Sequence, residues 1–234
     1  MTGHIPPGYF ERAFEFDWTD YANDRMEKVL EEFDDIVMGY FHGHDHSDAI
    51  RLHTAAGPGG KPTVVSYLAP AGAPLSQNPG FRSYQYDRAT FEILDLTQYY
   101  VDLDKANAEQ KITWEREYSA KEYFGMDSLK PEAWEQLHQQ FLSNDTAFQR
   151  FSRINYVQYD LLPCGKACKA TMLCGCFAVT TAKHKACMAS FGHATEEQAA
   201  EAQRLEDLLV GRDKIRTHMP FAEEAQPGDA VDSR

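Results

Sequence analysis

The sequence lacks long apolar runs and any excess of basic residues. No stretch approaches the roughly 18 apolar residues that a membrane-spanning helix requires. Lys and Arg number 23 against 36 Asp and Glu, which gives a net charge of −13. A surface this acidic repels phosphate backbones and disfavours binding to nucleic-acid polymers. Any phosphate would have to be recognised at a local positive charge, and a bound metal ion is the simplest source.

Cysteine is scarce, and all five cysteines lie between residues 164 and 187. Such a cluster indicates either disulfide bonds or a structural zinc site. The first eight residues, Met-Thr-Gly-His-Ile-Pro-Pro-Gly, lack the charged and apolar regions of a signal peptide. Because the cysteine pattern is typical of secreted proteins, we expect that sequence upstream of Met1 is missing.

Apolar periodicity predicts a strand-rich first part that extends to about residue 105. Apolar side chains at helical spacing predict a helix over residues 20–33. Compact apolar runs predict buried strands at 36–41 and 63–68. Two further strands, 81–86 and 91–103, are expected to pair around a turn at residues 87–90.

The second part is predicted to be helical. Pro131 suits the first position of a helix, and Gly125 suits the end of one. The predicted helices cover residues 114–124, 131–141, 148–159 and 195–210. The tail from about residue 217 is polar and is expected to fray. Together the two parts predict a mixed α/β (α+β) fold.

Three histidines occupy positions that favour metal binding. His4 lies in a Gly-His-x-Pro-Pro-Gly loop, and His44 and His46 follow the predicted strand 36–41 in the order Gly-His-Asp-His. Ligands often bind at strand ends, and residues two apart point to one side of an extended chain. Glycine before His4 and before His44 allows the backbone to come close to an ion. Three converging imidazoles suit zinc, iron or manganese.

Each histidine also has a structural interpretation, as a surface or hydrogen-bonded side chain. His42 lies two residues before His44, so it is expected to face the same side as His44 and His46 without coordinating a metal. The other histidines show no such arrangement and are expected to be structural or solvated: His53, His138, His184, His193 and His218.

An ordered series of motifs gives a family resemblance. After the Gly-His-x-Pro-Pro-Gly loop come Phe-His-Gly-His-Asp-His-Ser-Asp at 41–48, Leu-Ala-Pro at 68–70 and Asn-Pro-Gly-Phe-Arg-Ser-Tyr at 78–84. This series resembles acid sphingomyelinase and the acid sphingomyelinase-like phosphodiesterases. The resemblance extends to residue 187 through Leu94-Asp95, Tyr99-Tyr100, Trp114, Tyr118, Leu129-Lys130-Pro131, Trp134, Phe148-Gln149 and Pro163-Cys164-Gly165.

The resemblance implies a calcineurin-like metallophosphoesterase with two zinc ions bridged by a water or hydroxide. By position, His4 and His44 resemble ligands of one zinc and His46 a ligand of the other, while Asn78 resembles a loop residue near the site. The implied substrate is sphingomyelin or a nucleotide-type phosphodiester. The implied domains are the C-terminal half of the metallophosphoesterase β-sandwich (1–105), a helical disulfide-containing domain (106–216) and a disordered tail (217–234).

The family's other site motifs are absent from this sequence. In that family an Asp-x-His motif, a Gly-Asp motif with the bridging aspartate and a Gly-Asn-His motif carry the remaining ligands and the acid. Gly-Asp-x-x-Asp at 228–232 lies in the polar tail, and its order and context mark it as chance. We therefore expect a C-terminal fragment that contains no catalytic residue of its own and is inactive alone. The alternative is a non-catalytic secreted binding module derived from the same fold.

The resemblance also implies disulfides Cys164–Cys168 and Cys174–Cys187, with Cys176 free. Spacing alone leaves open a zinc knuckle that includes His184, in a cytosolic protein. Asn144 begins an Asn-x-Thr glycosylation sequon. For the full-length protein the resemblance implies a secreted or lysosomal location, with peripheral membrane contact as a further expectation.

Overall fold

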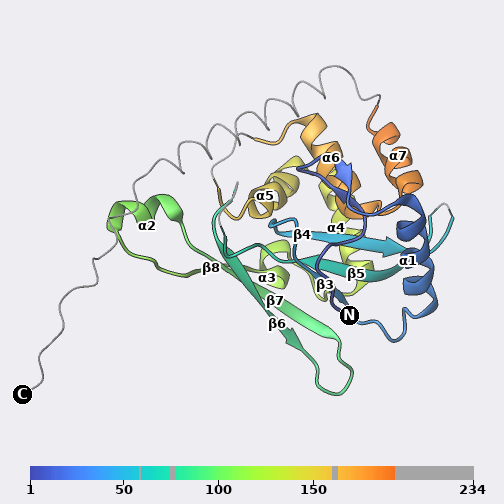
Figure 1. The fold of residues 1–234 in the computed structure, drawn as a ribbon, viewed down its shortest axis with the longest axis horizontal. Coiled ribbons are helices and arrows are strands. Elements are labelled where there is room, and N and C mark those ends of the chain that lie inside the picture. Colours follow the sequence, from blue (N-terminus) through green and yellow to red (C-terminus); the bar gives the residue numbers. More distant parts are fainter. Residues whose placement is uncertain (58, 74–76, 160–162, 193–234) are drawn as a thin grey trace, which may run out of the picture.

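The computed structural model describes residues 1–57, 59–73, 77–159 and 163–192, and two three-stranded sheets form its centre (Figure 1). The first sheet has the order β3-β5-β4, in which β3 and β5 are parallel and β4 is antiparallel to β5. The second is the antiparallel sheet β6-β7-β8. The strands are β3 (Tyr40–His42), β4 (Ala49–Thr54), β5 (Pro62–Leu68), β6 (Gly80–Tyr86), β7 (Ile93–Tyr100) and β8 (Glu115–Ser119), besides the short pair β1 (Tyr9–Phe10) and β2 (Glu15–Phe16).

Local sequence signals begin and end several of the helices. The Thr19 hydroxyl accepts a hydrogen bond from the Ala22 amide at the start of α1, and the Asn144 side chain accepts one from Ala147 at the start of α5. Gly125 ends α3 with a φ of 68°, a left-handed conformation that glycine adopts without strain. The helices are α1 (Asp20–Glu32), α2 (Leu103–Glu109), α3 (Ala120–Phe124), α4 (Pro131–Ser143), α5 (Asp145–Asn155), α6 (Lys166–Phe177) and α7 (Thr181–Ser190).

The two faces of the first sheet differ in chemistry. One face is apolar and packs against α4 and the second sheet in the main core, with Val65, Tyr67 and Trp134 among its members. The other face packs against α1 through a smaller cluster of Leu30, Tyr40 and Val64. That second face also carries buried polar side chains, namely His42, Arg51, His53 and Ser66. Burial of so many polar groups requires hydrogen-bonded partners, and the site described below supplies several of them.

Two disulfides fix the C-terminal helices. Cys164 and Cys168 are bonded with a Cα–Cα distance of 5.3 Å, and Cys174 and Cys187 join α6 to α7 at 5.6 Å. Cys176 is a free, buried thiol. The expected pairing is therefore confirmed, and a zinc knuckle built from these four cysteines is excluded.

The mixed α/β (α+β) fold is confirmed, and several element predictions need correction. Residues 36–39 do not form a strand; Ile36 is 68% exposed, and only Tyr40–His42 pair with β5. The predicted helix over 114–124 is instead strand β8 followed by the short helix α3, because residues 115–119 pair with β7. The short pair β1–β2, strand β4 and helices α2, α6 and α7 were not predicted.

The remaining predictions are unaffected or untested. The predicted helix at 195–210 and the tail lie outside the described residues. The predicted domain division stays a prediction, and its boundary at 105/106 falls between β7 and β8, which belong to one sheet. No described helix has the length and apolar character needed to cross a bilayer.

Candidate functional site

The N-terminal residues extend the first sheet alongside β3. The Phe41 amide donates to the Met1 carbonyl at 3.1 Å, and the Gly3 amide donates to the Phe41 carbonyl at 2.9 Å. One step further, the Gly43 amide donates to the His4 carbonyl at 3.1 Å. Because this pairing is parallel, His4 arrives at the same carboxyl end of the sheet as the loop that follows β3.

The two glycines that precede the histidines allow this close approach. A Cβ atom at Gly43 would lie 3.5 Å from Nδ1 of His4, and one at Gly3 would lie 3.2 Å from the ring of His42. A side chain at Gly3 would press on the ring of His42, whereas a Cβ at Gly43 would make only an ordinary contact with His4. The predicted role of these glycines, close approach of the backbone to an ion, stays a prediction.

The loop that carries His44 and His46 is not extended. His44 has a φ of 69° and His46 a φ of 58°, both in the left-handed region. Each such residue costs on the order of 1 kcal/mol, and neighbouring contacts must hold it in place. The expectation that the two rings share a side because the chain is a regular strand is therefore wrong. A coiled loop, anchored by the buried Asp45 between them, sets their directions instead.

The structure brings His4 and His44 together. Their ring centroids are 5.3 Å apart with an edge-to-face angle of 81°. His46 lies within electrostatic reach, since burial and the charges of His44, Arg12 and His4 all lower its pKa. Its Nδ1 atom is buried and has no hydrogen-bond partner among the residues that the structure describes. Two imidazoles are thus adjacent at the sheet end, and the third is close by with an unsatisfied ring nitrogen.

Sequence reasoning missed Asp17, which follows β2 and approaches the histidines from the side. Its Oδ1 lies 3.9 Å from Nε2 of His44, and its side chain is only 6% exposed. Within the described part of the chain, its Oδ2 has no hydrogen-bond partner. Burial raises the pKa of Asp17, and the charges of Arg51 and His44 partly oppose that rise. A carboxylate beside an imidazole can orient the ring or bind a metal with it. No motif around Asp17 distinguishes it from the other acidic residues in the sequence.

These groups fit part of a metal site. Within the described residues, no three His, Cys, Asp or Glu side chains are close enough together to hold a metal ion. His4 and His44 provide two adjacent imidazoles, and His46 and Asp17 each have a buried side-chain atom without a hydrogen-bond partner among the described residues. This donor set suits zinc, which accepts nitrogen and carboxylate oxygen ligands.

The other predicted neighbours have structural roles. Asn78 is buried; its amide donates to the Val157 carbonyl at 3.0 Å and its oxygen accepts from the Leu103 amide at 3.2 Å. His42 lies on the α1 side of the sheet with its Nε2 3.5 Å from the Ser66 hydroxyl, and burial lowers its pKa to about 4. Neither contact points to metal binding.

A chain of buried contacts continues from Ser66 to the surface of the molecule. The Ser66 hydroxyl lies 2.8 Å from Nε2 of His53, and Nδ1 of His53 lies 2.6 Å from Glu27. Lys183 of α7 donates to Glu27 at 2.6 Å. His138 and His184 stack on Phe177 and Tyr9. These histidines are structural, as expected, while His193 and His218 lie outside the described residues.

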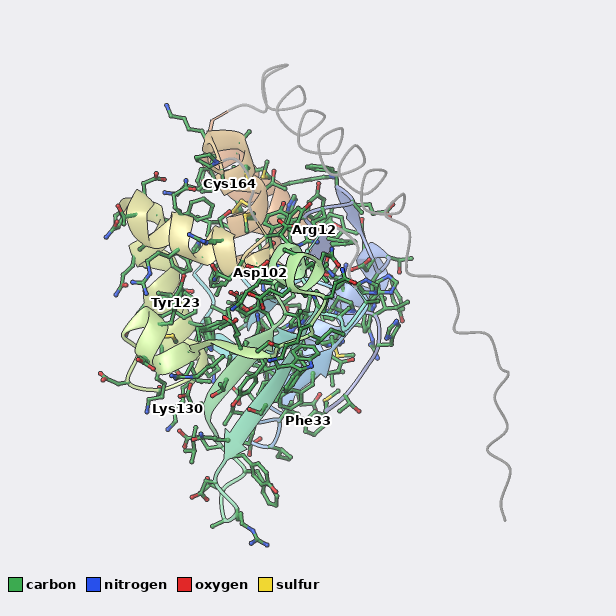
Figure 2. The ribbon with its side chains drawn as sticks, turned by 90° about the vertical axis from the view of Figure 1, so that its left-hand side faces the viewer. Arg12, Phe33, Asp102, Tyr123, Lys130 and Cys164 are labelled. Atoms are coloured by element: carbon green, nitrogen blue, oxygen red, sulfur yellow. A yellow bond between two sulfur atoms is a disulfide. The ribbon has the colours of Figure 1, made fainter. Side chains whose placement is uncertain are left out.

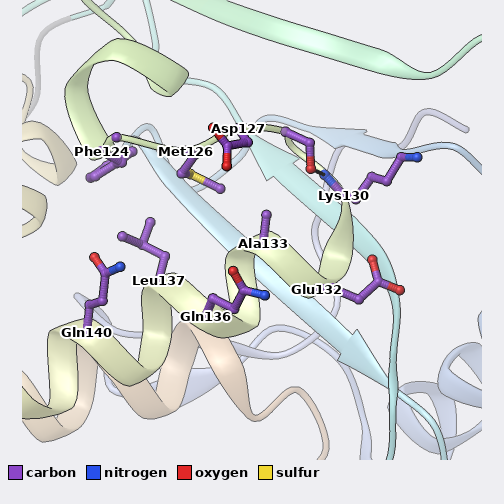
Figure 3. A pocket seen from close by; sticks show the side chains of 11 residues that line it. Phe124, Met126, Asp127, Lys130, Glu132, Ala133, Gln136, Leu137 and Gln140 are labelled. Carbon is purple, nitrogen blue, oxygen red and sulfur yellow. Dashed lines mark hydrogen bonds between the residues drawn. The ribbon is translucent and has the colours of Figure 1, made fainter.

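A separate shallow cleft lies between the α3–α4 connection and α4 (Figure 3). Its lining includes Phe124, Met126 and Gln136 and contains no histidine. Lys130, one of its lining residues, lies below Arg12, whose charge acts on His46, in the view of Figure 2. The cleft is therefore distinct from the histidine site.

Comparison with known proteins gives a consistent assignment. Residues 62–193 match the family described as acid sphingomyelin phosphodiesterase C-terminal region. The human cyclic GMP-AMP phosphodiesterase SMPDL3A is 29% identical over 198 residues, which cover 80% of this chain and 43% of that protein. The mouse acid sphingomyelinase-like phosphodiesterase 3b is 28% identical over 203 residues, covering 82% of this chain and 44% of that protein.

The similarity is not confined to animals. Sphingomyelin phosphodiesterase A of Dictyostelium discoideum is 28% identical over 188 residues, covering 80% of this chain and 31% of that protein. The chain thus spans less than half the length of these curated relatives. Because the family match covers more than half of the chain, this protein belongs to the acid sphingomyelin phosphodiesterase family, and its matched segment is the family's C-terminal region.

Proposed function

We propose that this chain provides His4, His44 and His46 to the two-zinc site of a phosphodiester hydrolase of the acid sphingomyelinase type. The observation that carries the proposal is the adjacency of His4 and His44 at the sheet end, 5.3 Å between ring centroids, in a chain of this family. Parallel pairing of the N-terminal residues with β3 creates that adjacency.

When bound, two zinc ions would supply an activated water and stabilise the charge on the leaving oxygen of a phosphodiester. The chain's own part is to hold imidazoles at the site and to exclude water beneath it with buried residues. The substrate class is a phosphodiester of lipid or nucleotide type, in line with the sphingomyelin and cyclic GMP-AMP named for its relatives. Zinc would also provide the local positive charge that the acidic surface lacks.

We expect the chain alone to be inactive. Three neutral imidazoles do not balance the charge of two adjacent dications, and the described residues do not bring three ligands together. Robust zinc-dependent turnover of a chromogenic phosphodiester by the purified chain, lost in His44→Ala, would contradict this expectation.

Zinc binding tests the ligand assignment separately from turnover. Calorimetric titration with zinc should show one site in the wild type and a marked loss of affinity in His4→Ala and His44→Ala. His138→Phe is the matched control, because His138 is buried against Phe177 and the substitution keeps that aromatic stack. Equal affinity in all four proteins would refute the assignment.

The second candidate is a non-catalytic binding module, favoured by the incomplete set of ligands among the described residues. The transcript separates the two candidates. An in-frame upstream segment that encodes Asp-x-His and Gly-Asn-His indicates the enzyme, and a mature transcript without one indicates the module.

We also propose a secreted or lysosomal location, which the two disulfides support because such bonds persist in oxidising compartments. Asn144 is exposed at the junction between α4 and α5. Expression in a secretory host should add a glycan that Asn144→Gln removes.

A further inference from the structure

Arg51 lies beneath both histidine-bearing loops. It is on β4, its side chain is 0% exposed, and it faces the same side of the sheet as His42. A buried guanidinium presents donors in a fixed, planar fork, so it can hold two acceptors in a defined relation.

The guanidinium binds two carboxylates, one from the His44–His46 loop and one from the turn that follows β1. Its Nη2 donates to Glu11 Oε2 at 2.9 Å and to Asp45 Oδ2 at 2.9 Å. Asp45 stands between His44 and His46, whereas Glu11 belongs to the segment that follows the His4 loop. The two side chains come from segments 34 residues apart, and the same nitrogen holds both.

The aliphatic part of Arg51 also supports the His4 loop. A Cβ atom at Gly8, whose φ is 103°, would lie 3.4 Å from Cδ of Arg51. The Gly-His-x-Pro-Pro-Gly loop therefore rests on the arginine stem at its last glycine. A larger residue at position 8 would be strained by its backbone conformation and crowded by this stem.

Neighbouring groups hold the acceptors in place. Asn155 donates to Glu11 Oε1 at 3.2 Å and to the Asp48 carbonyl at 2.9 Å. The Asp48 amide in turn donates to the Asn155 carbonyl at 3.2 Å. Asn155 thus fixes the far side of Glu11 and the end of the His44–His46 loop together.

We infer that Arg51 is a positioning residue that sets the distance between His4 and the His44–His46 loop by binding Glu11 and Asp45 at once. The left-handed backbone at His44 and His46 supports this role, because such strain persists only where other contacts impose it. As a contribution to metal binding, the inference rests on the proposed function. As a statement about the histidine geometry, it is independent of that function.

The experiment measures histidine geometry without metal and cobalt(II) binding in parallel. Asp45→Ala is the main variant, because it releases the His44–His46 loop while Glu11 still neutralises Arg51. Arg51→Lys keeps the charge but removes the planar guanidinium, whose Nη2 holds both carboxylates while its Nη1 donates to the Ile50 carbonyl at 3.2 Å. Asp95→Ala is the matched control, since Asp95 accepts hydrogen bonds from Ser119 and the Lys121 amide in the other sheet.

The first readout is the nuclear Overhauser effect between the rings of His4 and His44 in histidine-labelled protein. We expect it in the wild type and in Asp95→Ala, and we expect its loss in Asp45→Ala and Arg51→Lys with unchanged circular dichroism. Cobalt(II) affinity should fall about 10- to 100-fold in the same two variants, the usual effect of removing an outer-shell partner.

The outcomes separate the two claims. Retention of the ring–ring effect in folded Asp45→Ala and Arg51→Lys would overturn the positioning role and leave Arg51 as a structural ion pair. Loss of the ring–ring effect in these two variants, combined with no cobalt(II) binding by the wild type, would uphold the positioning role and contradict the proposed metal site. A loss in Asp95→Ala as well would also overturn the specific role of Arg51.

Discussion

Glu117 should make the stability of this protein fall as the pH rises. Its carboxylate lies on β8 and accepts hydrogen bonds from Gln98 at 2.7 Å and Gln158 at 3.1 Å. Burial, together with the nearby charge of Asp48, raises its pKa from 4.5 to about 8, although the two amides and Arg82 act in the opposite direction. The folded state therefore binds this proton more tightly than the unfolded state.

The sign and size follow from proton linkage. The contribution is fully present below pH 4.5 and is lost as the pH rises toward about 8. Within that interval one bound proton changes the free energy of unfolding by about 1.4 kcal/mol per pH unit. Over the whole interval this gives a maximum contribution of about 5 kcal/mol to the free energy of unfolding, which water penetration and local relaxation would reduce.

The test compares wild type with Glu117→Gln by urea unfolding from pH 5 to 8. The glutamine keeps the shape and does not titrate, so the variant should gain about 1.4 kcal/mol per pH unit relative to wild type. The comparison cancels other titrating groups, including buried histidines such as His138, whose pKa burial lowers to about 4. Glu115→Gln is the control. Glu115 lies on the same strand as Glu117 but forms an exposed ion pair with Lys105 of α2, so this variant should keep the wild-type slope. Identical slopes for wild type and Glu117→Gln would refute the reasoning.

Two further changes test the packing of the helical part. Replacing Cys174 and Cys187 by Ala should lower the free energy of unfolding by about 3 kcal/mol, because the disulfide closes a loop over 13 residues. Unfolding of the reduced and oxidised wild type at the same urea concentration would contradict this. Phe141→Ala should lower the free energy of unfolding by about 3–5 kcal/mol, because Phe141 is fully buried against Phe151. Leu142→Ala, at a neighbouring residue that is 41% exposed, should change it by less than about 0.5 kcal/mol. Equal effects of the two substitutions in chemical denaturation would contradict the assigned core.

Elements with one dominant signal were predictable from the sequence. Helix α4 has Pro131 at its first position and a regular apolar face, and the β6–β7 hairpin has alternation on both sides of a polar turn. Strand β8 was not predictable, because Trp114, Tyr118 and Glu122 also fit a helical period, and only pairing with β7 decides the conformation. Strand β4 was missed because its sequence, Ala-Ile-Arg-Leu-His-Thr, buries an arginine and a histidine that normally indicate a surface.

The candidate site was predictable in its members but not in its geometry. The motif order pointed to His4, His44 and His46, yet spacing does not reveal the left-handed backbone at two of them or the contact of Asp45 with the buried Arg51 on β4. Asp17 could not be found because its position beside His44 depends on the short β1–β2 hairpin. Residues that act through tertiary contacts leave no spacing pattern in the chain.

The location of bound zinc tests the central claim most directly. A crystal of the purified chain soaked in zinc, with data collected at the zinc absorption edge, would place any bound ion by its anomalous signal. We expect the strongest peak about 2.0–2.1 Å from imidazole nitrogens of both His4 and His44, with no such peak in His44→Ala. A peak elsewhere, with none at His4 and His44, would contradict the assignment of these histidines to the zinc site.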